Sequence, residues 1–464
     1  MSSKFYWILI IAALIITRFY GFNWGNGYSF HPDENNMAAS ISQMSLTNFN
    51  PHFFAYGQFP LYLAFFTQKL INIPNTFINS IYTLRIWSAI FSCLSVFILY
   101  LIFSNKLFFL LLVFTPGLIQ MAHFGTTESL LLFVFVFTLY LTNTKHYFLA
   151  SVICGIGIAT KISSIIFIIP VILSSVKDKQ FLKLFLFLIF TLAVSCFLSP
   201  YNLIKFSDFI STLNYETAVA TGTLSVFYTH QFIGTFPYLF QFTHIFPYIA
   251  GLPMFILALL SVFKLKINKS NLIAIFSSLL YFLYFGQVFV KWTRFMSPLF
   301  FAFPLLATLF LNHLRPVIKY LLTAVCLIPG FIFLSQYFRP DIRVIASDWI
   351  NQFIPSQSIL LSESGNVVNL PLNSKIGNVT NYDFYQEPAP NVDQYDYILI
   401  PSRRVFKNNF APKYYQQLFS NQLNFTQIKQ FAPLPDLFLN DENAEETWTV
   451  FDRPTIRIFK KVYP

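Results

Sequence analysis

The sequence predicts a polytopic α-helical membrane protein that carries a small α/β domain at its C-terminal end. The first observation is composition: of the 464 residues, 55% are hydrophobic, 60 are Phe and only 11% are charged, with a mean hydropathy of +0.58. A soluble core of this length requires less apolar surface. The second observation is a change in the balance of basic and acidic residues near residue 339. Positions 1–338 hold 18 basic and 6 acidic residues, whereas 339–464 hold 12 basic and 13 acidic residues.

Apolar runs predict about eleven membrane spans, because one crossing takes about 20 residues and an interrupted run can be shorter. Their approximate limits are 5–20, 86–103, 107–121, 129–143, 147–160, 162–176, 184–199, 239–262, 271–289, 296–312 and 320–337. We expect the first run to be retained, because Phe5–Ile16 leads through Arg18 into an aromatic stretch without a small-residue cleavage site.

Alternate connections between these spans are basic, which predicts that they face the cytoplasm. They contain Lys4, Lys106, Lys145, Lys177, Lys179, Lys183, Lys264, Lys266, Lys269, Arg315 and Lys319, with Asp178 as their single acid. We therefore expect a protein of the plasma membrane with a cytoplasmic N-terminus and an extracytoplasmic C-terminal domain. The remaining acids of the membrane part then fall on the outer side: Asp33, Glu34, Glu128, Asp208 and Glu216.

Two outer connections, 21–85 and 200–238, are too long to be turns. Long ordered loops in compact proteins usually carry function. Residues 60–71 within the first are apolar on one side but too short to span, which favours a helix lying at the membrane interface.

The domain at 339–464 shows a mixed pattern of helix and strand. Residues 341–354 form an amphipathic helical pattern, and a second helix is predicted at Tyr414–Leu423. Strands are predicted at Ser358–Ser362, Tyr397–Ile400 and Ile456–Val462.

Some functions are disfavoured by composition. Four cysteines, Cys93, Cys154, Cys196 and Cys326, lie in apolar runs without paired spacing, so neither disulfides nor a zinc knuckle is indicated. The basic residues are scattered between spans and form no stripe, so a nucleic-acid partner is not expected.

Adjacent carboxylates at Asp33 and Glu34 follow the first span directly, after His31 and Pro32. Ionised groups beside a bilayer are costly and tend to mark function. The alternative is structural: both acids would cap or charge the first turn of a helix, which is worth about 1 kcal/mol.

Several segments together resemble the GT-C superfamily of membrane glycosyltransferases, which includes protein O-mannosyltransferases and aminoarabinose transferases. The run 33–44 resembles the Asp-Glu motif and following helix of the family's first periplasmic loop, and Gly57–Tyr62 is similar to its Pro-Pro-Leu-Tyr segment, with Phe59 in place of the first proline. The segments that resemble other motifs of the family are Arg85–Ser88, Gly155–Lys161, Arg294–Leu299 and 341–363. The resemblance implies an inverting hexosyl- or pentosyltransferase that uses a polyprenyl-phosphate-linked sugar and is similar to mannosyltransferases of the cell envelope.

The chemistry of such a transfer indicates roles for individual residues. An acceptor hydroxyl needs a base, and the resemblance implies Asp33, with Glu34 as a second catalytic acid. Departure of the lipid phosphate leaves negative charge that fixed cations would stabilise, and Lys161, Lys291 and Arg294 fall at outer ends of predicted spans. Lys161 has an alternative as an interfacial anchor. Arg85 is expected to anchor its span.

A divalent metal is a further hypothesis. The family often has an acid at the position of Glu128 that helps to bind a metal or the phosphate, and His123 lies nearby in sequence. Alternatively, Glu128 is a first-turn acid, and His123 and His31 are ordinary loop residues. His31, Tyr228 and His230 are possible substrate contacts on the two long outer loops.

The sequence thus predicts a glycosyltransferase that moves sugar from a polyprenyl-phosphate donor to a glycan, lipid or protein acceptor outside the cytoplasm. Cytoplasmic segments contain no Gly-rich phosphate loop, which argues against a nucleotide-sugar donor. The alternative is a transporter or flippase of lipid-linked saccharide, which would show charges near the midplane and repeated halves. An inactive assembly protein is the third possibility.

Overall fold

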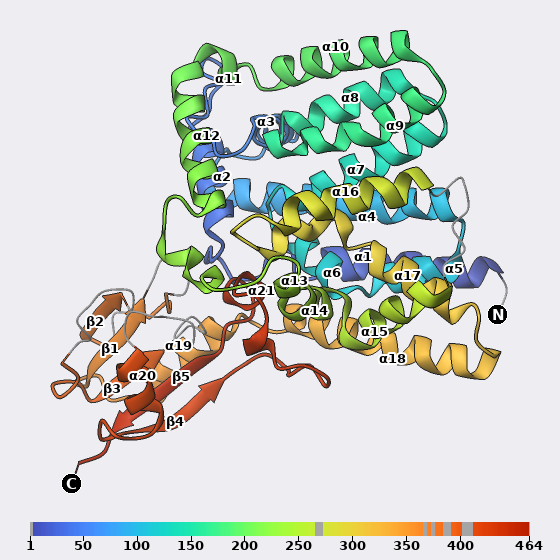
Figure 1. Cartoon of the computed structure of the whole chain (residues 1–464). Helices are drawn as coiled ribbons and strands as arrows, with labels where there is room; N and C mark the ends of the chain where they lie inside the picture. The colour runs from blue at the N-terminus through green and yellow to red at the C-terminus, as the bar shows by residue number, and fades with distance from the viewer. Residues whose placement is uncertain are drawn as a thin grey trace. The chain divides into compact units, whose positions relative to one another are not determined.

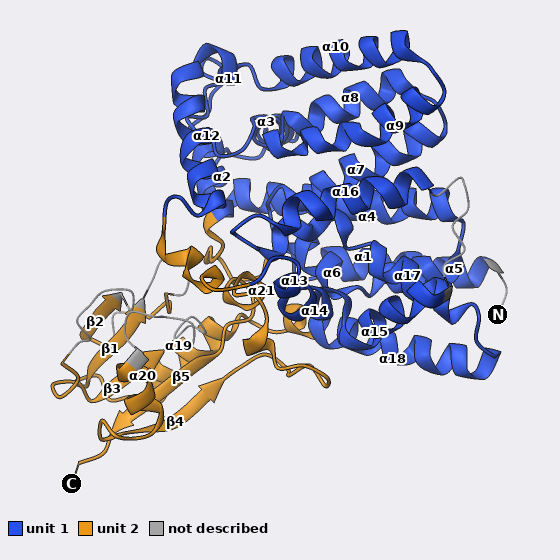
Figure 2. Cartoon of the chain, viewed as in Figure 1, with its two compact units in different colours: residues 1–22, 33–224, 236–334 blue, residues 23–32, 225–235, 335–464 orange. Residues whose placement is uncertain are grey.

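The computed structural model describes residues 3–264, 272–364, 369–372, 376–383, 391–400 and 412–463. It divides into two compact units (Figure 2). Unit 1 comprises 1–22, 33–224 and 236–334, and unit 2 comprises 23–32, 225–235 and 335–464. Unit 2 thus contains the stretch 339–464 and two short segments that belong to the long outer connections of the sequence. Lys266 and Lys269, assigned to a basic loop, lie outside the described residues.

Unit 1 is helical, and the predicted spans fall on one or more of its helices (Figure 1). The last span, 320–337, extends past the end of unit 1 at Leu334. Its helices up to the second outer connection are α1 (Ser3–Phe19), α2 (Pro32–Ser42), α3 (Phe59–Leu70), α4 (Phe77–Phe103), α5 (Lys106–Val113), α6 (Pro116–His123), α7 (Glu128–Asn143), α8 (Tyr147–Ile158), the 3-10 helix η1 (Ile162–Ile168), α9 (Ile169–Lys177) and α10 (Phe181–Leu198). The later ones are α11 (Tyr201–Ile204), α12 (Phe206–Thr221), α13 (Leu239–His244), α14 (Phe246–Ala250), α15 (Leu252–Ser261), η3 (Val262–Lys264), α16 (Leu272–Gly286), η4 (Thr293–Leu299), α17 (Ala302–Leu311) and α18 (Pro316–Leu334).

Three of these helical stretches are long and apolar enough to cross a membrane: Phe77–Phe103, Phe181–Leu198 and Pro316–Phe338. Three further pairs of helices qualify together but bend: α5 with α6 by 54°, α13–α14 with α15 by 117°, and η4 with α17 by 50°. Proline explains the first bend, because Pro116 cannot continue the helix before it. The number of eleven spans stays a prediction.

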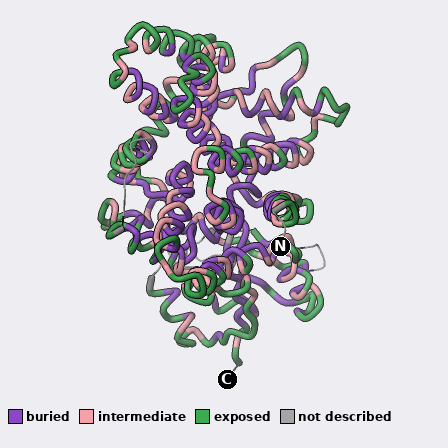
Figure 3. The backbone as a smooth tube through the Cα atoms, turned by 90° about the vertical axis from the view of Figure 1, so that its right-hand side faces the viewer, coloured by how far each residue is buried: buried purple, intermediate pink, exposed green. Residues whose placement is uncertain are grey.

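The first long outer connection is folded rather than extended. Helix α3 covers the predicted interfacial segment and buries one face. Buried apolar residues of α2 and α3 pack with Leu84 of α4: Met37, Ile41, Leu61, Ala64 and Phe65. This cluster fixes α2, whose first turn carries Asp33, against the long helix α4. Elsewhere in unit 1, buried and exposed stretches alternate along the helices (Figure 3).

Unit 2 is built on a five-stranded sheet of order β2-β1-β3-β5-β4, formed by β1 (Ile359–Ser364), β2 (Asn378–Asp383), β3 (Tyr397–Ile400), β4 (Phe425–Phe431) and β5 (Ile456–Lys461). Strand β1 is parallel to both β2 and β3, whereas β5 pairs antiparallel with β3 and β4. The other elements of the unit are η2 (Phe227–Phe232), η5 (Ser335–Phe338), α19 (Ile342–Phe353), α20 (Pro412–Phe419), η7 (Asp441–Asn443) and α21 (Thr447–Val450). The sequence pattern missed β2 and β4.

The two faces of the sheet are covered by different helices. Successive strand residues point to opposite faces, so Leu360 packs with Ile350 of α19 while Leu361 packs with Leu418 of α20. The apolar runs that were read as strands are therefore buried on both sides. That explains why they lack polar alternation.

A buried acid, Glu363 on β1, lies on the α20 side of this sheet. The hydroxyls of Tyr414 and Tyr415 donate hydrogen bonds to it over 3.2 and 2.8 Å. Burial raises the pKa of Glu363 to about 8, although both hydrogen bonds act in the opposite direction.

This raised pKa predicts pH-dependent stability in unit 2. Because the folded pKa exceeds the unfolded value, the contribution of Glu363 is fully present at acidic pH, below the unfolded pKa, and is lost as pH rises to about 8. Hydrogen exchange of β1 and α20 peptides, corrected for intrinsic rates, should show falling protection between pH 5 and 8. Glu363→Gln should flatten that dependence, and an unchanged slope in this variant would contradict the assignment.

Candidate active site

Asp33 and Arg294 form an ion pair in unit 1, between the carboxylate Oδ2 and the guanidinium Nη1. Their side chains are 19% and 21% exposed, so a ligand can reach both. The Tyr56 hydroxyl donates a hydrogen bond to Asp33 and lies 3.5 Å from Arg294 Nη1. The guanidinium carbon lies 4.5 Å from the centre of the Trp292 ring, a stacking contact that holds the fork in place.

A second charge pair lies beside the first. Lys161 Nζ is 4.0 Å from Glu128 Oε1. The same ammonium lies 5.2 Å from the centres of the Tyr56 and Phe295 rings. Tyr56 therefore joins the two pairs, because its hydroxyl serves Asp33 and its ring face packs against Lys161.

Each charged group stands at the start or the break of a helix. Pro32 opens α2, so Asp33 and Glu34 occupy its first turn. Glu128 is the first residue of α7, Lys161 directly precedes η1, and Arg294 is the second residue of η4. Acids at helix N-termini are stabilised by the helix dipole. Asp33 and Glu128 can therefore stabilise the first turns of their helices and belong to the charged cluster at the same time.

Glu34 has a different place from its neighbour. It is fully buried and accepts hydrogen bonds from Arg85 Nε at 2.9 Å, Arg85 Nη2 at 2.6 Å and the Gly125 amide at 2.6 Å. A Cβ on Gly125 would lie 2.8 Å from Leu84 Cβ, so the close approach requires glycine. Glu34, which the sequence predicted as a second catalytic acid, thus forms buried contacts that tie three segments together. It joins α2, which carries Asp33, to α4 and to the loop before α7, and α7 begins with Glu128.

The segment that carries Tyr56 is fixed against the segment that carries Lys161. Backbone hydrogen bonds run from Gly57 to Thr160 over 2.9 Å and from Phe59 to Ala159 over 3.1 Å. A Cβ on Gly57 would meet the Ala159 carbonyl oxygen at 2.0 Å. The backbone hydrogen bonds fix Tyr56 relative to Lys161. The close approach of the two segments explains why the Gly57–Tyr62 motif begins with glycine.

Electrostatics keep Tyr56 neutral. Burial raises the pKa of Tyr56 well above its ordinary value, and the negative charge of Asp33 adds to this effect. Glu216 of α12 belongs to the same charge field: burial raises its pKa, while Arg294 and Lys161 lower it. Tyr56, Trp292 and Glu216 were missed by the sequence pattern. The first two flank predicted motifs, and Glu216 is one of only six acids before residue 339.

The other residues predicted for the site have different contacts. Lys291 is buried and donates a hydrogen bond to the Phe289 carbonyl over 2.8 Å. His31, Tyr228 and His230 belong to unit 2, not to the unit that holds Asp33. The His31 ring lies 4.0 Å from the Phe451 ring, so the chain immediately before Asp33 is held inside unit 2.

The predicted metal ligands do not fit together. His123 is fully buried in unit 1, with its ring nitrogens 2.8 Å from the carbonyl oxygens of Ile119 and Tyr20. Glu128 instead faces the ammonium of Lys161. Among the described residues, no group of three His, Cys, Asp or Glu side chains could hold a metal ion. A metal held by Glu128 and His123 therefore stays a hypothesis, and the described contacts of the two side chains are with other groups.

Known structures share this fold. The sequence matches no protein-family model and no curated protein. The chain is similar to ArnT from Cupriavidus metallidurans bound to undecaprenyl phosphate, with 12% identity, 98% of each chain covered and a TM-score of 0.53. The same protein in the apo state gives 13% identity, the same coverage and a TM-score of 0.50. An apo oligosaccharyltransferase from Archaeoglobus fulgidus gives 11% identity, 87% and 70% coverage and a TM-score of 0.49.

Over 98% of its length, the chain thus has the fold of ArnT. At this identity the likeness concerns the fold, and the chemistry has to be argued from the residues.

Proposed function

We propose that this protein is a glycosyltransferase that takes a sugar from a polyprenyl-phosphate donor and transfers it to an acceptor hydroxyl outside the cytoplasm. The observation that carries this proposal is the cluster of Asp33, Tyr56, Glu128, Lys161 and Arg294 in unit 1. It combines an accessible carboxylate with two cations, which are the groups that a hydroxyl acceptor and a phosphate leaving group need. The ArnT structure bound to undecaprenyl phosphate supports this donor class.

Asp33 is the proposed base. Its carboxylate pairs with Arg294, and the Tyr56 hydroxyl orients it. An alcohol becomes a competent nucleophile only as its proton is taken in the transition state, so the base must stand within hydrogen-bond reach of the acceptor oxygen. One displacement at the anomeric carbon would invert its configuration.

Arg294 and Lys161 are the proposed phosphate site. A guanidinium can bind two phosphate oxygens at once, and an ammonium supplies a point charge. Arg294 Nε is buried and has no hydrogen-bond partner in the described part of the chain, so it is a donor left for a ligand. Binding of the phosphate would draw the fork of Arg294 toward it and release Asp33 from its ion pair, coupling donor binding to activation of the base.

The proposed orientation places this cluster outside the cytoplasm, with the N-terminus inside. The basic loops assigned to the cytoplasm include Lys106, the first residue of α5, and Lys145, which precedes α8. Lys161 follows the opposite end of α8 from Lys145. The lipid carrier would therefore present its sugar at the outer leaflet.

The function is tested with the purified full chain, undecaprenyl phosphate and a set of undecaprenyl-phosphate hexoses and pentoses. We expect undecaprenyl phosphate binding by native mass spectrometry. Arg294→Lys should weaken it about tenfold or more, because a charged hydrogen bond is worth about 1.5–3 kcal/mol. With one donor of the set and an acceptor, undecaprenyl phosphate should be released. Exhaustive chelation should leave binding and release unchanged.

The matched control is Lys319→Gln, since Lys319 of α18 instead hydrogen-bonds Asn312 over 2.7 Å. Loss of activity on chelation would restore a metal to the mechanism. Movement of the intact donor across vesicle membranes, without release of the phosphate, would support a flippase instead.

A further inference from the structure

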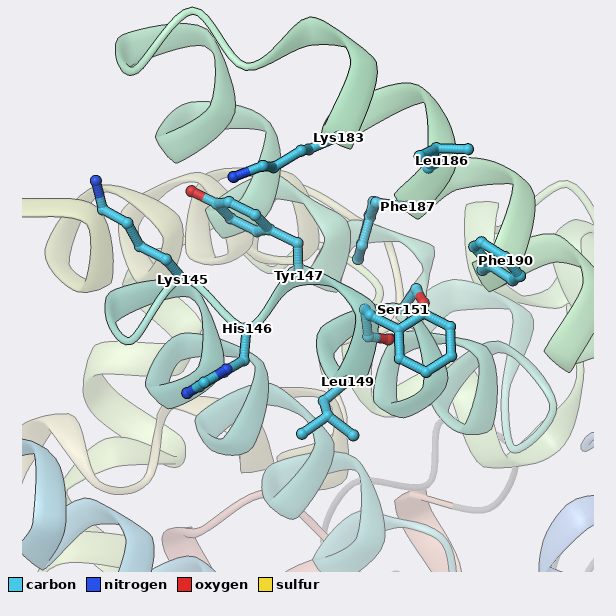
Figure 4. A pocket seen from close by; sticks show the side chains of 10 residues that line it. Lys145, His146, Tyr147, Leu149, Ser151, Lys183, Leu186, Phe187 and Phe190 are labelled. Atoms are coloured by element: carbon cyan, nitrogen blue, oxygen red, sulfur yellow. Dashed lines mark hydrogen bonds between the residues drawn. The ribbon is translucent and has the colours of Figure 1, made fainter.

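A groove between α8 and α10 lies at the other end of α8 from Lys161. Its cavity volume is about 460 Å³. The residues that line it are Lys145, His146, Tyr147, Phe148, Leu149, Ser151, Lys183, Leu186, Phe187 and Phe190 (Figure 4). All belong to unit 1.

Helices α8 and α10 pack against each other, and Gly155 marks a close contact beyond the groove. A Cβ on Gly155 of α8 would lie 2.6 Å from Val194 Cβ of α10, so the helices touch there. Both helices start at the groove end, and neither N-terminus has a side-chain cap. Buried Tyr147 and Phe187 form the floor of the groove.

The groove has an apolar wall and a basic end. Phe148 and Leu149 are 62% and 50% exposed, and Leu186 and Phe190 are exposed beside them. Lys145 and Lys183 lie at one end, and the Lys183 ammonium is 6.0 Å from the centre of the Tyr147 ring (Figure 4). Lys145 pairs with Asp178 over 2.8 Å, and Lys177 at the end of α9 and Lys179 in the following loop add to the positive charge at this end.

We infer that this groove binds an anionic diacyl phospholipid, with its phosphate at Lys145 and Lys183 and an acyl chain along Phe148 and Phe190. Four lysines against one aspartate attract a negative headgroup, and basic pockets between helices at a membrane surface bind such headgroups. The apolar wall continues from the basic end, which matches the order of head and tail in a lipid. The sugar carrier is disfavoured here, because its phosphate has to reach Lys161 at the opposite end of α8.

The experiment is native mass spectrometry of the full chain in detergent, titrated with phosphatidylglycerol, with phosphatidylcholine of the same acyl chains and with undecaprenyl phosphate. We expect the wild type to retain one phosphatidylglycerol in preference to phosphatidylcholine. The double variant Lys145→Gln/Lys183→Gln should raise its apparent Kd about tenfold, as expected for lost charged hydrogen bonds. Leu186→Trp should also weaken it by filling the groove without changing charge.

The matched control is Arg315→Gln/Lys319→Gln, which removes two positive charges at the start of α18, outside the groove. It should retain phosphatidylglycerol like the wild type. Equal loss in this control, or equal retention of phosphatidylcholine, would overturn the inference in favour of non-specific binding. Tighter retention of undecaprenyl phosphate, lost in the Lys145→Gln/Lys183→Gln variant, would overturn it in favour of the carrier lipid. Either result leaves the tests of Asp33 and Arg294 unaffected.

Discussion

Replacing Asp33 with asparagine is expected to lower turnover by about 100-fold or more, the usual contribution of a general base. The substitution is nearly isosteric and keeps one oxygen that can accept hydrogen bonds from Arg294 and Tyr56. It removes the ability to take the acceptor proton. The measurement is release of undecaprenyl phosphate from the sugar donor under saturating conditions.

Binding of undecaprenyl phosphate and the thermal unfolding midpoint serve as controls for this variant. Both should stay near those of the wild type, because Arg294 loses an ion pair but remains available for the phosphate. Unchanged turnover would remove Asp33 from the mechanism. A large fall in the unfolding midpoint would instead favour the structural role of a first-turn acid, since α2 would then depend on the charge.

The buried pair of Glu34 and Arg85 is expected to give the largest effect on stability. Glu34→Gln leaves the fully buried Arg85 without its carboxylate partner, and breaking such a pair costs about 3–5 kcal/mol. We expect a clearly lower thermal unfolding midpoint in lipid-free detergent. Turnover should fall as well, because the tie positions the helix starts that carry Asp33 and Glu128.

The double variant Glu34→Leu/Arg85→Met separates the ion pair from the packing around it. Replacing both charges by apolar groups should recover much of the lost stability, whereas turnover should stay low if the Gly125 contact positions the site. Lys145→Gln is the matched control, because it breaks an ion pair whose lysine is 59% exposed and should leave the unfolding midpoint close to that of the wild type. If Glu34→Gln changed the unfolding midpoint as little as Lys145→Gln and left turnover unchanged, the positioning role of Glu34 would be refuted.

Much of the fold could be predicted because its signals are local. Apolar runs gave the positions of the helices of unit 1, and the strands at Tyr397–Ile400 and Ile456–Lys461 came from β-branched and aromatic runs. Strand β4 was missed because most of its residues are polar and exposed. The bends within the helix pairs were also missed, because a continuous apolar run predicts one span whether the helix is straight or broken, as it is at Pro116.

For the site, the sequence by itself determined the types of charged group. Charged residues beside predicted spans are few, and together with the family resemblance they led to Asp33, Glu128, Lys161 and Arg294. They led equally to Glu34 and Lys291, which have other partners in the structure. Only the tertiary structure decided their partners. It separated neighbouring acids, with Asp33 beside Arg294 and Glu34 inside a pair with Arg85. It also placed His31 in the other unit. The physical reason is that burial and pairing depend on groups up to 261 positions away in the chain, which no local pattern records.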